Sequence, residues 1–226
     1  IRDSYEIWYD SDGNGTVDTI EASETVYDGF NDSDPDFGEI SYKFTFQHEC
    51  LHKVIYYSVD YLGNKEADHI KYFRVDDTPP NISIEYGKPY YKNITTGKEY
   101  ITSDTPIYIN ASDNRSAPCI VGSVHVNVSI YSLETHSWMY YEWHNYSGLA
   151  KINEIIHIIY GECKHWINIT ARDDLNNTAY LNKTVYVDNL PPKINMRING
   201  PSYQKTPTKY CVSNHTNIII NVSDCC

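Results

Sequence analysis

Short stretches of alternating apolar and polar residues make up most of the chain, and clusters of Gly, Pro, Asn, Asp and Ser separate them. An alternation with a period of two predicts β-strands that bury one face. The period places Ile167 and Ile169 on an inner face, and Trp166, Asn168 and Thr170 on the outer one. Between residues 78 and 188 the pattern predicts seven strands, at 82–86, 105–112, 123–132, 137–144, 152–159, 165–172 and 180–188.

The composition favours the same fold class. The chain has 22 Tyr but only 5 Phe and 2 Met, and no long Ala/Leu/Glu/Lys stretch has a helical period. Tyr suits strands, because its ring covers a pleated surface while its hydroxyl group stays in water. We therefore expect an all-β protein.

An internal repeat organises the chain. The segment 74–80, Arg-Val-Asp-Asp-Thr-Pro-Pro, recurs 112 residues later as Tyr-Val-Asp-Asn-Leu-Pro-Pro at 186–192. Glu-Cys-x-His also recurs, at 49–52 and 162–165. This internal repeat predicts that the chain consists of three parts, and that the given sequence starts and stops within a repeat. These parts are the C-terminal part of one repeat at 1–77, a complete repeat at 78–188 and the N-terminal part of the next at 189–226.

One sequence of features resembles that of a known family. A strand is followed by an Asp-x-x-Gly-Asn turn at 60–64, a second strand, and a Val-Asp-x-x-Pro-Pro junction at 75–80. This order is similar to the tandem immunoglobulin-like (fibronectin-III-like) repeats of archaeal and bacterial cell-surface proteins. The resemblance implies tandem immunoglobulin-like β-sandwiches of about seven strands per repeat. It also implies an extracellular spacer, S-layer component, adhesin stalk or filament subunit, and it implies no reaction.

Charge and hydropathy exclude two classes of partner. The formal net charge is −12, and the sequence has no basic stripe that could neutralise phosphates, so we expect no nucleic acid. No stretch approaches the roughly 18 apolar residues of a membrane helix, so we expect no membrane span in this window.

Asparagines point to the compartment. Of 20 Asn, 13 stand in Asn-X-Ser/Thr sequons, whereas chance would place about three there. This excess predicts covalent N-glycans and an extracellular or cell-surface location. Strand periodicity places sequons such as Asn127 on solvent-facing positions. The predicted glycosylation sites are Asn31, Asn81, Asn93, Asn110, Asn114, Asn127, Asn145, Asn168, Asn176, Asn182, Asn214 and Asn221.

Six cysteines in such a compartment should form disulfides. The repeat makes Cys50 equivalent to Cys163, and Cys119 equivalent to Cys226. We therefore predict a Cys119–Cys163 bridge inside the complete repeat. The same rule pairs Cys226 with a Cys50-type residue of a following repeat. Cys211 and Cys225 have no equivalents in the preceding repeat, so we pair them with each other.

The segment 10–21 fits a twelve-residue calcium loop, with oxygen ligands on alternate residues and Gly15 at the sharp turn. The alternative is a merely acidic turn. Asn14 would be both ligand and sequon, so calcium binding would leave it without a glycan. The predicted Ca²⁺ ligands are Asp10, Asp12, Asn14, Thr16, Asp18 and Glu21.

We expect no enzyme, because no nucleophile, phosphate-loop, dinucleotide or zinc-protease motif occurs. The leading hypothesis is a glycosylated structural protein whose partners are neighbouring copies or repeats of itself, in a surface filament or S-layer-like array. One alternative is an adhesin stalk or carbohydrate-binding module. A carbohydrate ligand could then lie on an aromatic platform of Trp138, Tyr140, Tyr141 and Trp143. Another alternative is the spacer region of a larger secreted enzyme.

Overall fold

The computed structural model describes residues 2–27, 43–60, 62–113, 119, 124–145, 151–158 and 161–224, except for the side chains of 27, 140–145 and 151–154. Every regular element of these residues is a β-strand, which confirms the predicted all-β class. None of the described residues forms a helix that is long and apolar enough to cross a membrane.

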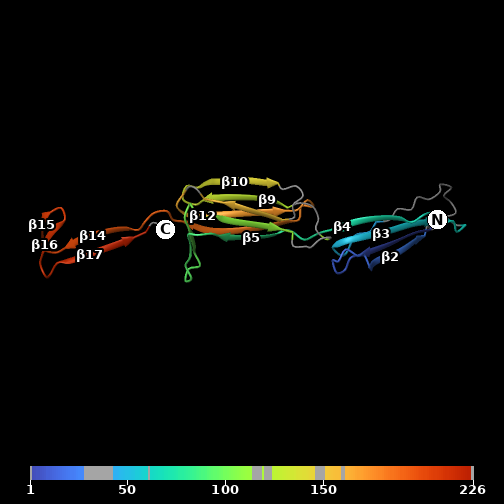
Figure 1. Ribbon diagram of the computed structural model, residues 1–226, viewed down its shortest axis with the longest axis horizontal. Coiled ribbons are helices and arrows are strands. Elements are labelled where there is room, and N and C mark those ends of the chain that lie inside the picture. Colours follow the sequence, from blue (N-terminus) through green and yellow to red (C-terminus); the bar gives the residue numbers. More distant parts are fainter. Residues whose placement is uncertain are drawn as a thin grey trace.

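The strands form three units that follow one another along a rod (Figure 1). We call β1–β4 the first unit, β5–β13 the middle unit and β14–β17 the third unit. In Figure 1 the N-terminus lies in the first unit, at one end of the rod, and the third unit lies at the other end. The segments 76–80 and 188–192 connect consecutive units along the chain.

The first unit is a single antiparallel sheet with the order β2-β1-β3-β4. Its small core consists of Tyr5, Ile7 and Val54, on the inner face of β1 and β3. The side chains of the edge strand β4 are exposed except at Val75. Its strands are β1 (Arg2–Tyr9), β2 (Thr19–Tyr27), β3 (Cys50–Val59) and β4 (His69–Val75).

The middle unit is a sandwich of two sheets, with the orders β10-β9-β12-β13-β7-β6 and β11-β8-β5. One apolar core lies between them, because Ile107 and Ile109 of β8 pack with Ile167 and Ile169 of β12. Its strands are β5 (Asn81–Tyr86), β6 (Tyr90–Lys92), β7 (Glu99–Ile101), β8 (Ile107–Ser112), β9 (His125–Ser132), β10 (Ser137–Asn145), β11 (Lys151–Ile156), β12 (Cys163–Arg172) and β13 (Thr178–Val187).

The seven strands predicted for this unit are all present, with ends shifted by up to three residues. In β12 the inner and outer faces are as predicted, since Ile167 and Ile169 are buried and Trp166 is exposed. The sequence missed β6 and β7. Each has only three residues, which is too short for an alternating pattern, and β7 pairs in parallel with the distant β13.

The third unit holds two two-stranded sheets, β14-β17 and β15-β16. These pairs match β5-β8 and β6-β7 of the middle unit, whereas the first unit has the order that β10-β9-β12-β13 has there. Apolar side chains of the third unit are open to solvent, among them Ile194 and Ile220. Its strands are β14 (Lys193–Asn199), β15 (Ser202–Thr206), β16 (Lys209–Val212) and β17 (Asn217–Ser223).

Candidate functional site

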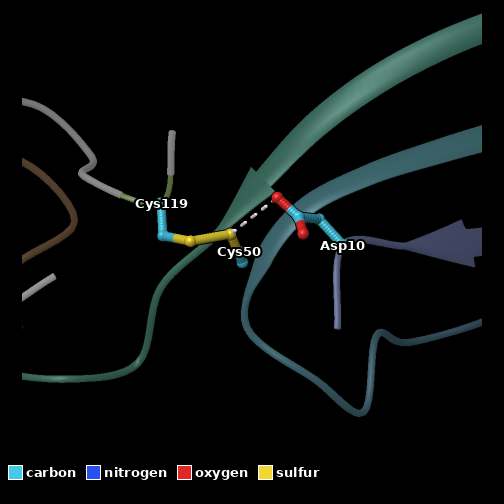
Figure 2. A group of neighbouring side chains, drawn as sticks. All are labelled: Asp10, Cys50 and Cys119. Atoms are coloured by element: carbon cyan, nitrogen blue, oxygen red, sulfur yellow. Dashed lines mark hydrogen bonds between the residues drawn. A yellow bond between two sulfur atoms is a disulfide. The ribbon is translucent and has the colours of Figure 1, made fainter. Parts of the chain in front are cut away.

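A disulfide joins the first unit to the middle unit. Cys50 opens β3, Cys119 lies between β8 and β9, and their sulfurs are bonded (Figure 2). The predicted Cys119–Cys163 bridge is therefore wrong. Cys163 opens β12, whose ten residues span about 33 Å towards the end of the sandwich that faces the first unit. Bridged cysteines need Cα atoms within about 7 Å, so a cysteine at the opposite end of β12 cannot reach Cys119.

The other cysteines also depart from the prediction. Cys163 is disulfide-bonded, and its partner lies outside the described residues, as do Cys225 and Cys226. Cys211 is free and exposed in β16, so the predicted Cys211–Cys225 bridge is wrong. The seven residues of β17, about 23 Å when extended, separate the β15-β16 hairpin from the end of the described chain.

Asp10 lies against this disulfide, with its Oδ2 atom 3.8 Å from Sγ of Cys50 (Figure 2). A half-cystine sulfur carries no proton, so this approach is a polar contact and not a hydrogen bond. Asp10, Cys50 and Cys119 are also the one group of potential metal ligands that converges within 4.8 Å among the described residues. Sulfur binds metals as thiolate, and the disulfide removes both thiolates, so this cluster is a structural link.

The acidic loop that follows β1 is folded around Asp10. The carboxylate of Asp10 is buried and accepts hydrogen bonds from the backbone N–H groups of Asn14 (3.1 Å) and Gly15 (2.7 Å). Asp12 accepts one from the side-chain amide of Asn14 at 2.9 Å, and the Asn14 side chain accepts one from the N–H of Thr16 at 2.7 Å. The structure thus brings Asp10, Asp12, Asn14 and Thr16 together. An open groove of about 630 Å³ runs beside Asp10 and Asp12.

The remaining two predicted calcium ligands lie differently. Asp18 is exposed and accepts a hydrogen bond from the hydroxyl group of its neighbour Thr19. The side chain of Glu21 is 2% exposed, and its carboxylate accepts hydrogen bonds from the backbone N–H groups of Gln47 and His48. Its Oε2 atom lies 3.1 Å from Nε2 of His52. Glu21 therefore holds residues 47 and 48 against β2, which departs from the predicted ligand set.

The two equivalent histidines have different neighbours. In both, Nδ1 lies at hydrogen-bond distance from the backbone oxygen two residues earlier, 3.2 Å in His52 and 3.0 Å in His165. Nε2 of His52 faces the Glu21 carboxylate, whereas Nε2 of His165 faces Sδ of Met139 at 3.2 Å. Burial lowers the pKa of His165 below its usual value, against opposing effects of the Cys163 carbonyl and nearby acidic residues.

This environment predicts a pH dependence for the middle unit. Because its pKa is lowered on folding, His165 binds fewer protons in the folded state than in the unfolded chain. Stability should be fully present above the unfolded pKa of about 6.5 and should fall as the pH drops through it. We expect a lower Tm at pH 5 than at pH 8, and a smaller difference in His165→Leu. The exposed His157 is the control, and an unchanged pH slope in His165→Leu would count against this origin.

The predicted glycosylation sites differ in exposure. Asn127 is only 7% exposed, so its predicted solvent-facing position is wrong. β9 lies between β10 and β12, and side chains of both neighbours can cover its outer face. Asn31 and Asn114, and the side chain of Asn145, lie outside the described part. The exposed sequon residues are Asn14, Asn81, Asn176, Asn182, Asn214 and Asn221, and the partly exposed ones are Asn93, Asn110 and Asn168.

An aromatic row crosses the outer face of the six-stranded sheet. The ring of Tyr131 lies 5.1 Å from that of Trp138 and 5.9 Å from that of Trp166, and the two Trp side chains are 59% and 43% exposed. Trp138 belongs to the predicted platform. Tyr131 and Trp166 were not part of that prediction, because they lie on different strands. The side chains of Tyr140, Tyr141 and Trp143 lie outside the described set.

Comparisons with known proteins add little. No family model and no curated protein matches the chain. Among solved structures, the chain is similar to one described as a Ca²⁺-stabilized adhesin that helps an Antarctic bacterium reach out and bind ice. The identity is 10% and the TM-score 0.25, over 86% of this chain and 43% of the adhesin chain. The chain thus spans less than half of that protein, and a similarity at this level supports no conclusion about function.

Proposed function

We propose that the chain is a glycosylated, extracellular structural protein without enzymatic activity, and that it supplies repeat units of a surface filament or S-layer-like array. The observation that carries this proposal is the Cys50–Cys119 disulfide, which joins two consecutive units and not two strands of one unit. Such a bond adds a second covalent link between neighbouring units, besides the polypeptide chain itself. It also favours an oxidising compartment, in agreement with the excess of sequons.

The repeat extends this link to the next junction. Cys163 is equivalent to Cys50 and is itself disulfide-bonded. Cys226 is equivalent to Cys119. The proposal therefore assigns Cys226 as the partner of Cys163, so that each unit is bonded to the following one by the same pair of positions.

Open apolar faces support self-association. Ile194, Ile220 and Val222 of the third unit are 71%, 63% and 62% exposed. Large open apolar surfaces usually mark interaction sites. The first and third units carry strand sets that are adjacent parts of one sandwich in the middle unit. The proposed partners are therefore neighbouring copies or repeats, whose matching strands cover these faces.

Calcium belongs to the proposal through the loop after β1. Its ligands would be Asp10, Asp12, Asn14, Thr16 and Asp18, because hard oxygen atoms suit Ca²⁺. We expect Asp12→Asn to weaken calcium binding at this loop by roughly tenfold or more, as measured by isothermal titration. Asp68→Asn removes an exposed carboxylate in the same unit and is the control. If both variants bind calcium equally well, the segment 10–21 is an acidic turn and not a calcium loop.

Electron microscopy of the native, non-reduced material in Ca²⁺ tests the main proposal. Long regular filaments or sheets with a repeat of two units are the expected result. Isolated short rods would contradict a polymer and favour the stalk of an adhesin or the spacer of a secreted enzyme.

The aromatic row favours a second candidate function, a carbohydrate-binding module. Exposed aromatic rings in a row offer flat apolar surface to a sugar, with polar groups beside them. A groove of about 270 Å³ adjoins Trp166 and is lined by Asn168, Asn182, Lys183 and Thr184. A glycan-binding screen of the chain and of Trp166→Ala tests it. Binding lost in the variant would support the module, and no binding by the chain would remove it.

A further inference from the structure

A groove on the outer face of the six-stranded sheet lies between two neighbouring sequons. It measures about 270 Å³ and is lined by Trp166 and Asn168 of β12 and by Asn182, Lys183 and Thr184 of β13. In the antiparallel register of these strands, Trp166 stands opposite Thr184, and Asn168 stands opposite Asn182. Two glycan acceptors from different strands therefore meet beside one aromatic side chain.

Trp166 and Asn168 share the outer face of β12. Side chains two residues apart on a strand point to the same side, about 6.6 Å apart along the strand. Ile167 between them is buried in the core, and Thr170 completes the sequon on the outer face. Asn168 is only partly exposed, whereas Asn182 is exposed and is the diagonal neighbour of Trp166. A sugar on Asn168 therefore starts closer to the floor of the groove and to the indole ring.

The groove lies on the side of the Trp166 ring away from Tyr131. Tyr131 of β9 stacks on this ring, with centroids 5.9 Å apart and an interplanar angle of 25°. The strand order is β9-β12-β13, and the groove is lined by β12 and β13, so a ligand there meets the opposite face of the indole. The electron-rich face of an indole attracts C–H groups of a ligand.

The size and lining of the groove suit one sugar ring. Pockets for drug-sized ligands measure about 300–1,000 Å³, so a groove of about 270 Å³ suits a monosaccharide better than an oligosaccharide. A pyranose ring has an apolar face of C–H groups and an edge of hydroxyl groups. Trp166 can pack on that face, while the side chains of Asn182 and Thr184 can hydrogen-bond the edge.

We propose that this groove holds the first sugar of the N-glycan on Asn168, with the apolar face of that sugar packed on Trp166. The inference rests on the glycosylation in the proposed function and adds the place where one glycan lies. A covalent attachment makes the contact intramolecular, so a weak interaction is enough to hold the sugar there. A groove filled in this way is closed to an external carbohydrate, which distinguishes the inference from a carbohydrate-binding module.

Hydroxyl-radical footprinting of the native glycosylated chain tests the proposal, with oxidation of each tryptophan measured by peptide mass spectrometry. We expect Trp166 to be oxidised about twofold more in Asn168→Gln than in the parent, because the sugar covers one ring face. Asn182→Gln removes the neighbouring glycan acceptor and is the matched control, in which Trp166 should stay protected. Trp138, which is 59% exposed on the same face, should react equally in all three proteins.

Glycopeptide analysis of the same samples separates the ways in which the proposal can fail. If Asn168 carries no glycan, the inference is overturned together with glycosylation at this site. If Asn168 carries a glycan and Trp166 reacts equally in the parent and in Asn168→Gln, the inference is overturned while glycosylation stands. Loss of protection in Asn182→Gln and not in Asn168→Gln would assign the groove to the other glycan and would also overturn it.

Thermal unfolding provides a second readout. Trp166→Ala should lower the Tm of the glycosylated parent by roughly 3 °C more than it lowers that of Asn168→Gln, because only the parent has a sugar on the ring. Trp138→Ala removes the other exposed tryptophan of the aromatic row and should lower both Tm values equally. Equal effects of Trp166→Ala in the two backgrounds would show that no sugar packs on this ring.

Discussion

The double variant Cys50→Ser, Cys119→Ser is expected to lose about 4 kcal/mol of stability, the chain-entropy value for a loop closed by cysteines 69 residues apart. The disulfide restricts the unfolded chain, so its removal lowers the free energy of unfolding. It also covalently joins the first unit, with its three-residue core, to the well-packed middle unit. We expect the first unit to be affected most.

Denaturant unfolding followed by tryptophan fluorescence measures this loss, and limited proteolysis shows where it occurs. Trp8 reports on the first unit, and cleavage should become faster in residues 76–80, which connect β4 to β5. Cys211→Ser is the matched control, because that cysteine is free and exposed. A double variant as stable and as protease-resistant as this control would show that the bond contributes nothing to the junction.

Ile169→Ala is expected to destabilise the middle unit by about 3 kcal/mol, from lost burial and from the cavity that remains. Ile169 is 1% exposed on β12 and packs in the core between the two sheets. The loss should appear as a lower denaturant midpoint with an unchanged slope, since the same surface is exposed on unfolding.

The control for this core prediction is Ile155→Ala in β11, where the side chain is 58% exposed. It removes the same atoms from a site that is open to solvent, and we expect a change within about 0.5 kcal/mol. Similar losses in both variants would contradict the assignment of inner and outer faces.

The sequence predicted a strand correctly where apolar and polar residues alternate over enough positions to show a period of two. β12 shows this best, because the buried His165, Ile167, Ile169 and Ala171 alternate there with outward polar or aromatic side chains. Periodicity reports only which face a residue is on, and not how far neighbours cover that face. Asn127 shows the difference, since it stands on an outward position of a strand with neighbours on both edges and is nevertheless buried.

The cysteines show another limit of the sequence. The repeat identified Cys50 and Cys163 as equivalent, but it could not tell whether a bridge lies inside a unit or between units. That choice depends on which end of the middle unit each cysteine occupies, and therefore on strand direction.

Peptide mapping of the native protein without reduction identifies which cysteines are bonded. We expect a Cys50–Cys119 peptide pair, a Cys163–Cys226 pair, and Cys211 as a free thiol that alkylates without reduction. A Cys119–Cys163 pair would contradict the proposed structural role, since the bond would then lie within the middle unit and would not cross-link consecutive units.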